Sequence, residues 1–279
     1  MAKSWMRERI ANPQRNHRRP LLGHSEQEIA LDKDMQENLM VPEHTLVNQS
    51  NTNTPLIQLS GLTKKYDGLA GTVTALKGIE LAILAGEFLV ITGKSGSGKT
   101  TFVNMVAGLD ECTAGEIHVA GTAVHTLSPA KAARWRGRTV GVVFQTFELL
   151  PTLSVLHNVM LPMDLARRYS LRQRRKRAMH LLDQVEIADH ALKLPSGVSG
   201  GQQQRVAIAR ALANDPPIIV ADEPTGSLDS HTAHQVLDVF EELLNQGKTV
   251  VMVTHDRDIA QRATRAVTLA DGEIVDERN

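Results

Sequence analysis

The fold follows from the segment FLVITGKSGSGKTT, which occupies residues 88–101. Its first letters are apolar or β-branched, a pattern that predicts a buried strand ending at Thr92. The letters GKSGSGKT come next and satisfy the pattern G-x-x-x-x-G-K-[ST]. A helix is predicted directly after them, and its apolar face comprises Phe102, Met105, Val106 and Leu109. This order of strand, glycine-rich loop and helix is the one that a phosphate-binding loop requires.

The loop has the chemistry to hold a phosphate chain. Its glycines let backbone N–H groups curl around phosphate oxygens, and the following helix directs its positive end at the same place. We expect Lys99 to reach the terminal phosphates and Thr100 to ligate Mg²⁺. The residues of this segment predicted to bind a nucleotide are Gly93, Lys94, Ser95, Gly96, Ser97, Gly98, Lys99, Thr100 and Thr101.

A second apolar strand, residues 218–221, ends in the acidic pair Asp222 and Glu223. We expect Asp222 to lie near the metal, and the carboxylate of Glu223 to orient and deprotonate a water that attacks the γ-phosphate. Paired acids at a strand end are also common in solvated turns. The presence of the phosphate loop favours the catalytic interpretation, and therefore hydrolysis.

The chain from Leu56 onward alternates short apolar runs with helical patterns. The runs are continuously apolar, which indicates strands of a mainly parallel sheet covered by helices on both faces. The predicted fold class is therefore α/β. The clearest predicted strands are residues 87–92, 139–144, 217–221 and 249–254, and a further core helix presents Leu237, Phe240, Leu243 and Leu244.

Composition excludes several classes of protein. The 279 residues are 42% hydrophobic and 22% charged, and 31 basic residues balance 31 acidic ones, so no overall field attracts nucleic acid or anionic lipid. A single cysteine, Cys112, excludes an internal disulfide and fits a reducing compartment. The apolar runs are shorter than the ~20 residues of a membrane helix, and the first residues make a poor signal peptide. We expect a chain that stays in the cytosol.

Residues 1–55 differ from the rest. A basic stretch gives way to an acidic one, and the polar tract 48–55 has the composition of a flexible linker. Ser25 and Glu28 have the spacing of a helix capping box. The favoured interpretation is a largely disordered extension with a transient helix, because the apolar surface is small. A docking segment for a partner is the alternative.

Residues 198–202 read VSGGQ and precede a predicted helix. A serine followed by two glycines at a helix start forms a second anion cradle, although a simple N-cap and tight turn explain these residues equally well. The motif resembles the signature of ATP-binding cassette (ABC) proteins, usually LSGGQ. Together with the phosphate loop and the pair Asp222 and Glu223, it identifies residues 56–279 as similar to the nucleotide-binding subunit of an ABC transporter.

The resemblance implies a P-loop NTPase cassette with a mainly parallel core sheet, an antiparallel β subdomain and a helical signature subdomain over about 146–215. It also implies roles for further residues. Tyr66 corresponds to the aromatic residue that stacks on adenine, and Gln145 to the glutamine that touches Mg²⁺ and adjoins the membrane subunit. Asp229 belongs to the D-loop, and His255 to the switch that contacts the γ-phosphate. The expected catalytic residues are thus Glu223, His255 and Lys99, and the expected metal ligands are Thr100, Gln145 and Asp222.

The family further implies a head-to-tail dimer, most simply a homodimer, that closes on ATP and Mg²⁺. In such a dimer the signature of one subunit closes on the phosphate loop of the other and completes the nucleotide site. The signature residues expected to contact ATP are Ser199, Gly200, Gly201 and Gln202. ATP then holds two subunits together, and hydrolysis assisted by Glu223 releases them.

A narrower resemblance rests on residues 144–155, 200–210 and 221–229. These segments are similar to the bacterial subfamily of lipoprotein-release, macrolide and peptide exporters and the cell-division cassette. The subfamily implies a transmembrane permease partner with extracytoplasmic domains, and a peripheral position on the cytoplasmic face of the inner membrane. Three residues depart from the usual pattern: Lys94 stands where proline is common, Val198 replaces leucine, and Ser227 replaces asparagine.

Two other functions deserve comparison with an export or mechanotransmission ATPase. A soluble cassette ATPase acting on DNA or ribosomes usually carries a coiled-coil insertion or a second cassette, and residues 146–196 are too few for such an arm. We therefore expect no nucleic-acid partner. A clamp that binds ATP without hydrolysis is disfavoured because both Glu223 and His255 are present. The basic run between Arg167 and Arg177 is interpreted as a solvated helix face, with contact to anionic lipid or an acidic loop as the alternative.

Overall fold

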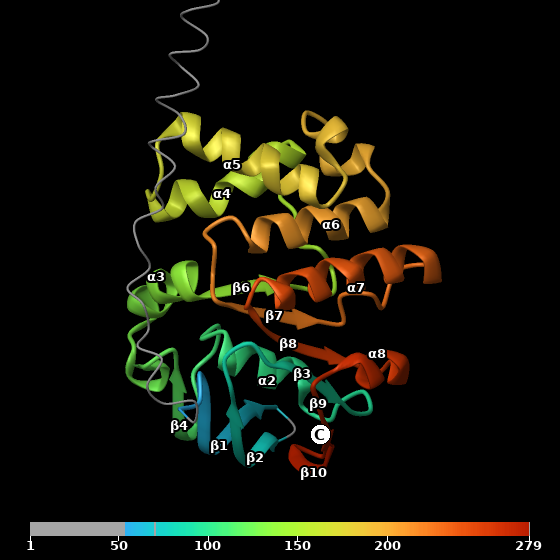
Figure 1. Cartoon of the computed structure of the whole chain (residues 1–279). Coiled ribbons are helices and arrows are strands. Elements are labelled where there is room, and N and C mark those ends of the chain that lie inside the picture. Colours follow the sequence, from blue (N-terminus) through green and yellow to red (C-terminus); the bar gives the residue numbers. More distant parts are fainter. Residues whose placement is uncertain (1–53, 70, 279) are drawn as a thin grey trace, which may run out of the picture. The chain divides into compact units, whose positions relative to one another are not determined.

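The structure, a computed structural model, describes residues 54–69 and 71–278. Its core is a six-stranded sheet in the order β10-β9-β3-β8-β7-β6, in which all neighbours except β10 and β9 run parallel. This arrangement confirms the predicted α/β class and the mainly parallel core sheet (Figure 1). The strands are β3 (Phe88–Thr92), β6 (Val140–Val143), β7 (Ile218–Asp222), β8 (Thr249–Thr254), β9 (Arg265–Ala270) and β10 (Glu273–Arg278).

The central strands are buried on both faces, as their continuous apolar letters predict. Every residue of β7 and β8 is buried, and so are the first four residues of β3. The observed bounds differ from the predicted ones by one or two residues. Thr139 ends a helix, Phe144 follows β6, and Asp222 belongs to β7.

A second, antiparallel sheet has the strand order β2-β1-β4-β5, which confirms the predicted antiparallel β subdomain. Its strands are β1 (Ile57–Gly68), β2 (Gly71–Ile83), β4 (Ala114–Val119) and β5 (Thr122–Ala123). Apolar side chains on one face, among them Leu59, Leu76 and Ile117, are fully buried and share a core with the helix that follows the phosphate loop. The short turn η1 (Val124–Thr126) comes directly after β5.

Helix α2 (Lys99–Val106) follows the phosphate loop, and its residues Phe102, Met105 and Val106 are buried as predicted. The prediction was wrong for Leu109, which is 39% exposed. The helix ends at Val106, and Gly108 adopts a left-handed φ of 60°, so the chain turns away before Leu109 reaches the apolar face. The other helices near the sheet are α3 (Pro129–Thr139), α7 (Ser230–Asn245) and α8 (Arg257–Arg262).

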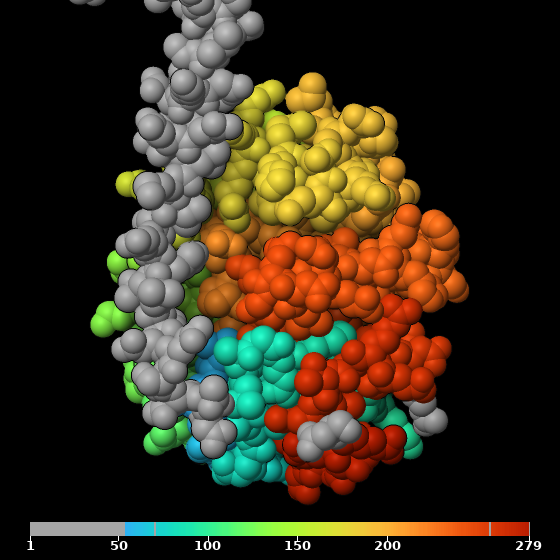
Figure 2. Space-filling model, viewed as in Figure 1, coloured from blue at the N-terminus to red at the C-terminus, as the bar shows by residue number. Residues whose placement is uncertain are grey.

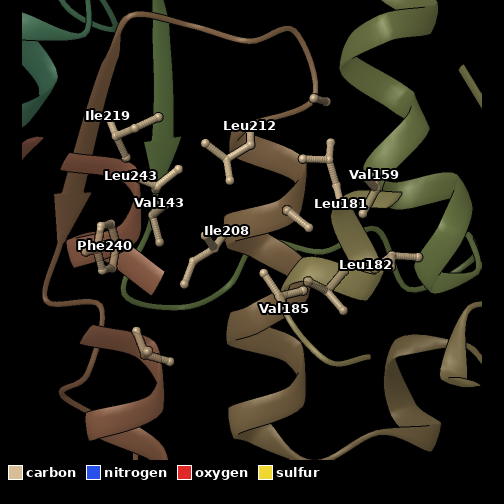
Figure 3. Packing of buried hydrophobic residues seen from close by; sticks show 14 of the residues in the cluster. Val143, Val159, Leu181, Leu182, Val185, Ile208, Leu212, Ile219, Phe240 and Leu243 are labelled. Carbon is tan, nitrogen blue, oxygen red and sulfur yellow. The ribbon is translucent and has the colours of Figure 1, made fainter. Parts of the chain in front are cut away.

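Helices α4 (Val155–Ala166), α5 (Leu171–Gln184) and α6 (Gly200–Ala211) form a layered helical segment beside the sheet (Figure 1). Ile208 and Leu212 lie between α5 on one side and the sheet with α7 on the other (Figure 3). A capping box between Ser170 and Gln173 begins α5. Two 3₁₀ turns, η2 (Ala188–His190) and η3 (Pro195–Gly197), join α5 to α6.

The basic run of α5 divides into paired and exposed residues. Arg174 pairs with Asp164, and Arg177 donates to the backbone carbonyls of Leu212 and Ala213 beyond the end of α6. These contacts tie α5 to its neighbours. The side chains of Arg172, Arg175 and Lys176 are exposed, as expected for a solvated helix face.

One face of the molecule presents α5, α7 and the β9–β10 hairpin in succession (Figure 2).

Within residues 54–69 and 71–278, no helix has both the length and the hydropathy needed to span a bilayer. The expectations for the basic and acidic stretches and for Ser25 and Glu28 concern residues outside the described part of the chain.

Candidate functional site

The phosphate loop lies at the end of β3, and backbone atoms of two other strands press against its glycines. A side chain at Gly98 would place its Cβ 2.5 Å from the carbonyl oxygen of Ala75 on β2. At Gly93 a Cβ would lie closer than 3.0 Å to the carbonyl oxygen of Leu269 on β9. Gly98 also has a left-handed φ of 104° and caps α2. Both positions therefore require glycine.

Lys99 is the first residue of α2, and its side chain folds back over the loop. Its Nζ donates to the carbonyl oxygens of Gly93 at 2.9 Å and Lys94 at 3.1 Å, and its side chain is only 10% exposed. The same Nζ lies 4.0 Å from Oε1 of Glu223. The loop thus holds a buried positive charge against its own backbone, whereas the side chain of Lys94 is exposed.

A cavity of about 430 Å³ opens beside the loop and collects predicted residues from α2, from the end of β7 and from the loops that follow β3, β6, β7 and β8. Sequence reasoning missed Ala75, whose place in the cavity depends on the packing of β2 rather than on a chemical side chain. Gly93, Lys94 and Ser97 line a second hollow, to which Ser95, Gly96 and His255 also contribute. The cavity is lined by Ala75, Ser95, Gly96, Gly98, Lys99, Thr100, Thr101, Gln145, Asp222, Glu223 and His255.

Asp222 ends β7 at this cavity and is 7% exposed. Burial raises the pKa of its carboxyl group, and the neighbouring charge of Glu223 acts in the same direction, while a hydrogen bond with the Thr100 side chain and the charge of Lys99 oppose the rise. Thr100, Asp222 and Gln145 each bring a side-chain oxygen to the cavity. Such an oxygen set fits Mg²⁺, which prefers hard oxygen ligands.

Glu223 follows directly and has a left-handed φ of 46°, unusual for a residue with a side chain. Its backbone N–H donates to the carbonyl of Val253 on β8 at 2.9 Å, which fixes the turn against the neighbouring strand. Oε2 of Glu223 lies 2.7 Å from Nδ1 of His255, which follows the end of β8. The carboxylate is 10% exposed and the imidazole 70% exposed, so the pair spans the cavity wall and its mouth.

Tyr66 lies on β1 and does not line the cavity. Its hydroxyl donates to Oδ2 of Asp110 at 2.9 Å, and Nζ of Lys64 lies 4.7 Å from the ring centroid. Burial raises the pKa of Tyr66, and a side-chain hydrogen bond with Thr101 opposes the rise. The contact with Thr101 connects the 40% exposed ring to the residue that follows Thr100 in the phosphate loop.

The signature residues also lie outside the cavity. Ser199 caps α6: its hydroxyl accepts from the N–H of Gln202, and the Gln202 side chain accepts from the N–H of Ser199 at 2.9 Å. A Cβ at Gly201 would lie closer than 3.0 Å to Cγ2 of Thr232. Oγ1 of Thr232 donates to Oδ2 of Asp229 at 2.7 Å. This hydrogen bond lowers the pKa of the Asp229 carboxyl group. Gly201 and Asp229 thus meet through Thr232, a contact that sequence reasoning missed.

Arg210 joins the helical segment to the loop after Gln145. Its guanidinium group donates to the carbonyl oxygens of Phe147, at 2.7 Å, and of Glu148. Both residues have left-handed φ angles, 44° and 50°. Burial lowers the pKa of Arg210, although the charge of Glu148 opposes that shift. The arginine therefore holds this turn, with its uncommon backbone geometry, against α6, the helix that follows the signature residues.

Comparisons with known proteins place this geometry in a family. A family model described as "ABC transporter" matches residues 76–226, which include the phosphate loop, the signature and the acidic pair. The chain belongs to the ABC transporter family. It is a cassette that binds and hydrolyses ATP, as this family does.

Several curated proteins are similar to the cassette. The "Uncharacterized ABC transporter ATP-binding protein YvrO" of Bacillus subtilis is 45% identical over 224 residues, which cover 80% of this chain and 97% of that protein. The "Macrolide export ATP-binding/permease protein MacB" of Pectobacterium atrosepticum is 45% identical over 226 residues. The "Pyoverdine export ATP-binding/permease protein PvdT" of Pseudomonas aeruginosa is 45% identical over 225 residues. The cassette spans 35% of MacB and 34% of PvdT.

A solved structure extends the likeness to three dimensions. It is the dimeric post-hydrolysis state of the ATP-binding cassette MJ0796 bound to ADP and Pi, with a TM-score of 0.76 and 43% identity. The likeness covers 80% of this chain and 98% of that one. The predicted ABC cassette fold is therefore confirmed.

The raised pKa of Asp222 predicts how stability depends on pH. This pKa is higher in the folded protein than the ordinary 3.8. The contribution of Asp222 to the free energy of unfolding is therefore present at low pH and is lost as the pH rises through the pKa of the folded state. The ligand-free Asp222→Asn variant should therefore unfold at a higher temperature than the wild type at neutral pH. Thermal unfolding between about pH 4 and pH 7 measures the difference, which should shrink as the pH falls.

With Mg²⁺ and ATP present the order should reverse, because the variant lacks the charged oxygen ligand. Asp183→Asn, an exposed carboxylate on α5, is the matched control and should follow the wild type under both conditions. A ligand-free Asp222→Asn variant less stable than the wild type at neutral pH would contradict the assignment of a desolvated carboxylate.

The contact between Gly201 and Thr232 predicts a compensating pair of substitutions. Gly201→Ala should destabilise the cassette by about 1–3 kcal/mol, because the new methyl group overlaps Cγ2 of Thr232. Thr232→Ser removes that methyl group and keeps the hydroxyl that bonds Asp229, so the double variant should recover most of the loss. Gly200→Ala is the control, since its Cβ meets only Phe147 at 3.8 Å. Urea unfolding of the wild type, the two single variants and the double variant gives the coupling energy, and simple additivity would refute the contact.

Proposed function

We propose that the cassette is the ATP-binding and hydrolysing subunit of an ABC-type export or mechanotransmission complex, and that ATP-dependent dimer closure drives a separate membrane subunit. The arrangement of Lys99, Glu223 and His255 around one cavity carries the proposal. Glu223 bonds His255 at 2.7 Å and lies 4.0 Å from Lys99 beside the phosphate loop. This set supports hydrolysis as well as binding.

The cavity residues divide the chemistry between them. Lys99 and the loop N–H groups bind the β- and γ-phosphates and stabilise the charge that develops on them. The Glu223 carboxylate accepts a proton from the attacking water as the new oxygen–phosphorus bond forms and the bond to ADP breaks. Its hydrogen bond with His255 orients the carboxylate, and the exposed imidazole stands at the cavity mouth to contact the γ-phosphate.

Thr100, Asp222 and Gln145 are the residues proposed to hold Mg²⁺. The ion would supply charge neutralisation on the phosphate oxygens. Thr100 and Asp222 are joined by a hydrogen bond, so the two ligands are already positioned next to one another. Gln145 is exposed and follows β6 by two residues, where a small movement brings its amide toward or away from the phosphates.

A second subunit explains the residues that lie outside the cavity. Ser199, Gly200, Gly201, Gln202 and Asp229 do not line the cavity of their own chain. We propose that they close on ATP bound to the partner in a head-to-tail homodimer. The dimeric MJ0796 structure supports this arrangement. Tyr66 is proposed to stack on adenine from the edge of the phosphate loop, next to Thr101.

The partner proposed for this dimer is a transmembrane permease with extracytoplasmic domains, which would place the cassette on the cytoplasmic face of the inner membrane. The support comes from MacB and PvdT, whose names join an ATP-binding part to a permease. The division into an extension over 1–55 and a cassette over 56–279, with a helical subdomain at about 146–215, remains a prediction. The alternative, a soluble ATPase acting on DNA or ribosomes, is not favoured by these relatives.

Glu223→Gln tests the catalytic assignment. The amide keeps the shape of the side chain and cannot take a proton, so ATP turnover should fall by about a hundredfold or more. The same variant should accumulate as a dimer in ATP and Mg²⁺, because bound nucleotide is no longer consumed. Turnover assays and light scattering measure the two effects in parallel.

Glu241→Gln is the matched control, because Glu241 is exposed on α7 and pairs only with Arg262 among the contacts seen in the described region. It should hydrolyse ATP at the wild-type rate. Equal turnover by wild type and Glu223→Gln would eliminate Glu223 as the base. A catalytically dead variant that stays monomeric in ATP would argue against the sandwich dimer.

The membrane partner is tested by fractionating cells that produce the full chain at its natural level. The cassette should sediment with membranes and, after detergent extraction, should elute with a protein that has transmembrane helices. Deleting the gene of that protein should release the cassette from the membrane fraction. Co-sedimentation with ribosomes, or with DNA until nuclease treatment, would support the alternative and overturn the proposal.

A further inference from the structure

A cluster of metal-ligating side chains lies at the edge of the antiparallel sheet, apart from the nucleotide cavity. Glu116 and His118 belong to β4, and His125 belongs to η1. One ligand atom from each residue can be chosen so that all three atoms lie within 4.8 Å of one another. None of the three residues lines the cavity that holds Lys99 and Glu223.

Local structure explains why these residues meet. Glu116 and His118 are two apart on a strand, so their side chains leave β4 on the same face. The β4–β5 hairpin turns at Ala120 and Gly121, which have left-handed φ angles of 46° and 73°, and pairs His118 with Ala123. The next turn, η1, brings His125 back alongside β4. The hairpin geometry thus assembles the cluster from a short stretch of chain.

His125 is held by the backbone of β4. The backbone N–H of Ile117 donates to Nδ1 of His125 at 3.0 Å, and the carbonyl oxygen of Ile117 lies 3.2 Å from the same ring nitrogen. Binding a metal through Nε2 requires the tautomer with the proton on Nδ1, which then donates to the Ile117 carbonyl and gives up the bond from the Ile117 N–H. Metal-bound histidines are commonly oriented in this way, with one ring nitrogen on a backbone carbonyl and the other on the ion.

His118 and Glu116 complete the set. Nε2 of His118 lies 3.2 Å from Oε2 of Glu116, and the rings of His118 and His125 are 5.4 Å apart at 64°. Ligands of a tetrahedral zinc ion lie about 3.4 Å from one another, given Zn–N and Zn–O bonds of about 2.1 Å. The His118–Glu116 separation of 3.2 Å is close to this value. The side chains of His118 and Glu116 are 44% and 63% exposed, so both have room to turn toward His125.

We propose that Glu116, His118 and His125 form a binding site for a divalent transition-metal ion of the zinc class. Two imidazoles and one carboxylate are ligands that suit Zn²⁺ and its neighbours, whereas Mg²⁺ prefers oxygen ligands alone. Three protein ligands leave a fourth position for water. The ion would connect β4 to the turn after β5, and thereby fasten the outer edge of the antiparallel sheet.

The test is calorimetric titration of the full, untagged chain with Zn²⁺ in excess Mg²⁺, which occupies sites built from oxygen. His118→Ala and Glu116→Gln should each weaken one binding event by more than tenfold. His180→Ala, an exposed histidine on α5, is the matched control and should leave that event unchanged. His17, His24 and His44 lie outside the described residues and are the same in every variant, so differences between variants report on the cluster.

Co²⁺ provides a second readout, because a tetrahedral site with nitrogen ligands absorbs visible light. The absorption should be present in the wild type and His180→Ala and absent from His118→Ala. His118 is half-exposed and its backbone pairing is independent of its side chain, so the metal-free variant should unfold at the wild-type temperature. Superimposable zinc titrations of the wild type, His118→Ala and Glu116→Gln would overturn the proposal, as would an equal loss of binding in His180→Ala.

Discussion

The phosphate-binding loop lies where the two sheets meet, and the close approach of three backbone segments to it constrains the rest of the structure. The carbonyl of Ala75 from the antiparallel sheet reaches Gly98, and the carbonyl of Leu269 from the core sheet reaches Gly93. The turn between β9 and β10 adds a third contact, since the N–H of Gly272 donates to the carbonyl of Ser97 at 3.1 Å. Any side chain on the two loop glycines would separate these segments. The loop therefore joins the sheets as well as binding phosphate.

The positions of the cavity residues were largely predictable because they depend on residue types at the ends of strands. Parallel strands carry their carboxyl ends to one edge, so Asp222 at the end of β7 and His255 after β8 had to lie near the loop after β3. The structure brings them together at the cavity, with Glu223 and His255 2.7 Å apart. The glycine pattern of the loop carried equally clear information, since few other arrangements need glycine and lysine at those spacings.

The parts that escaped prediction depend on long-range packing. Ala75 has no chemical side chain, and only the register of β2 brings its carbonyl to the loop. Thr232 and Arg210 are ordinary helix residues in sequence, and their roles come from the neighbours that they meet, Gly201 and the turn at Phe147. Leu109 shows the opposite error: helical spacing suggested a buried residue, but the helix ended before it. Periodicity does not reveal where a glycine will reverse the chain.

The capping box of the signature helix has a consequence for the proposed dimer, whose subunits would close on ATP and part again after hydrolysis. The N–H groups of Ser199 and Gln202 are satisfied by side chains of the same two residues. A surface that needed the partner to satisfy these groups would be costly to expose each time the subunits part. Here the lone subunit keeps these two N–H groups satisfied, so the attraction between subunits can come from the nucleotide itself. That attraction is lost when the nucleotide leaves, so the contact between the subunits is reversible rather than permanent.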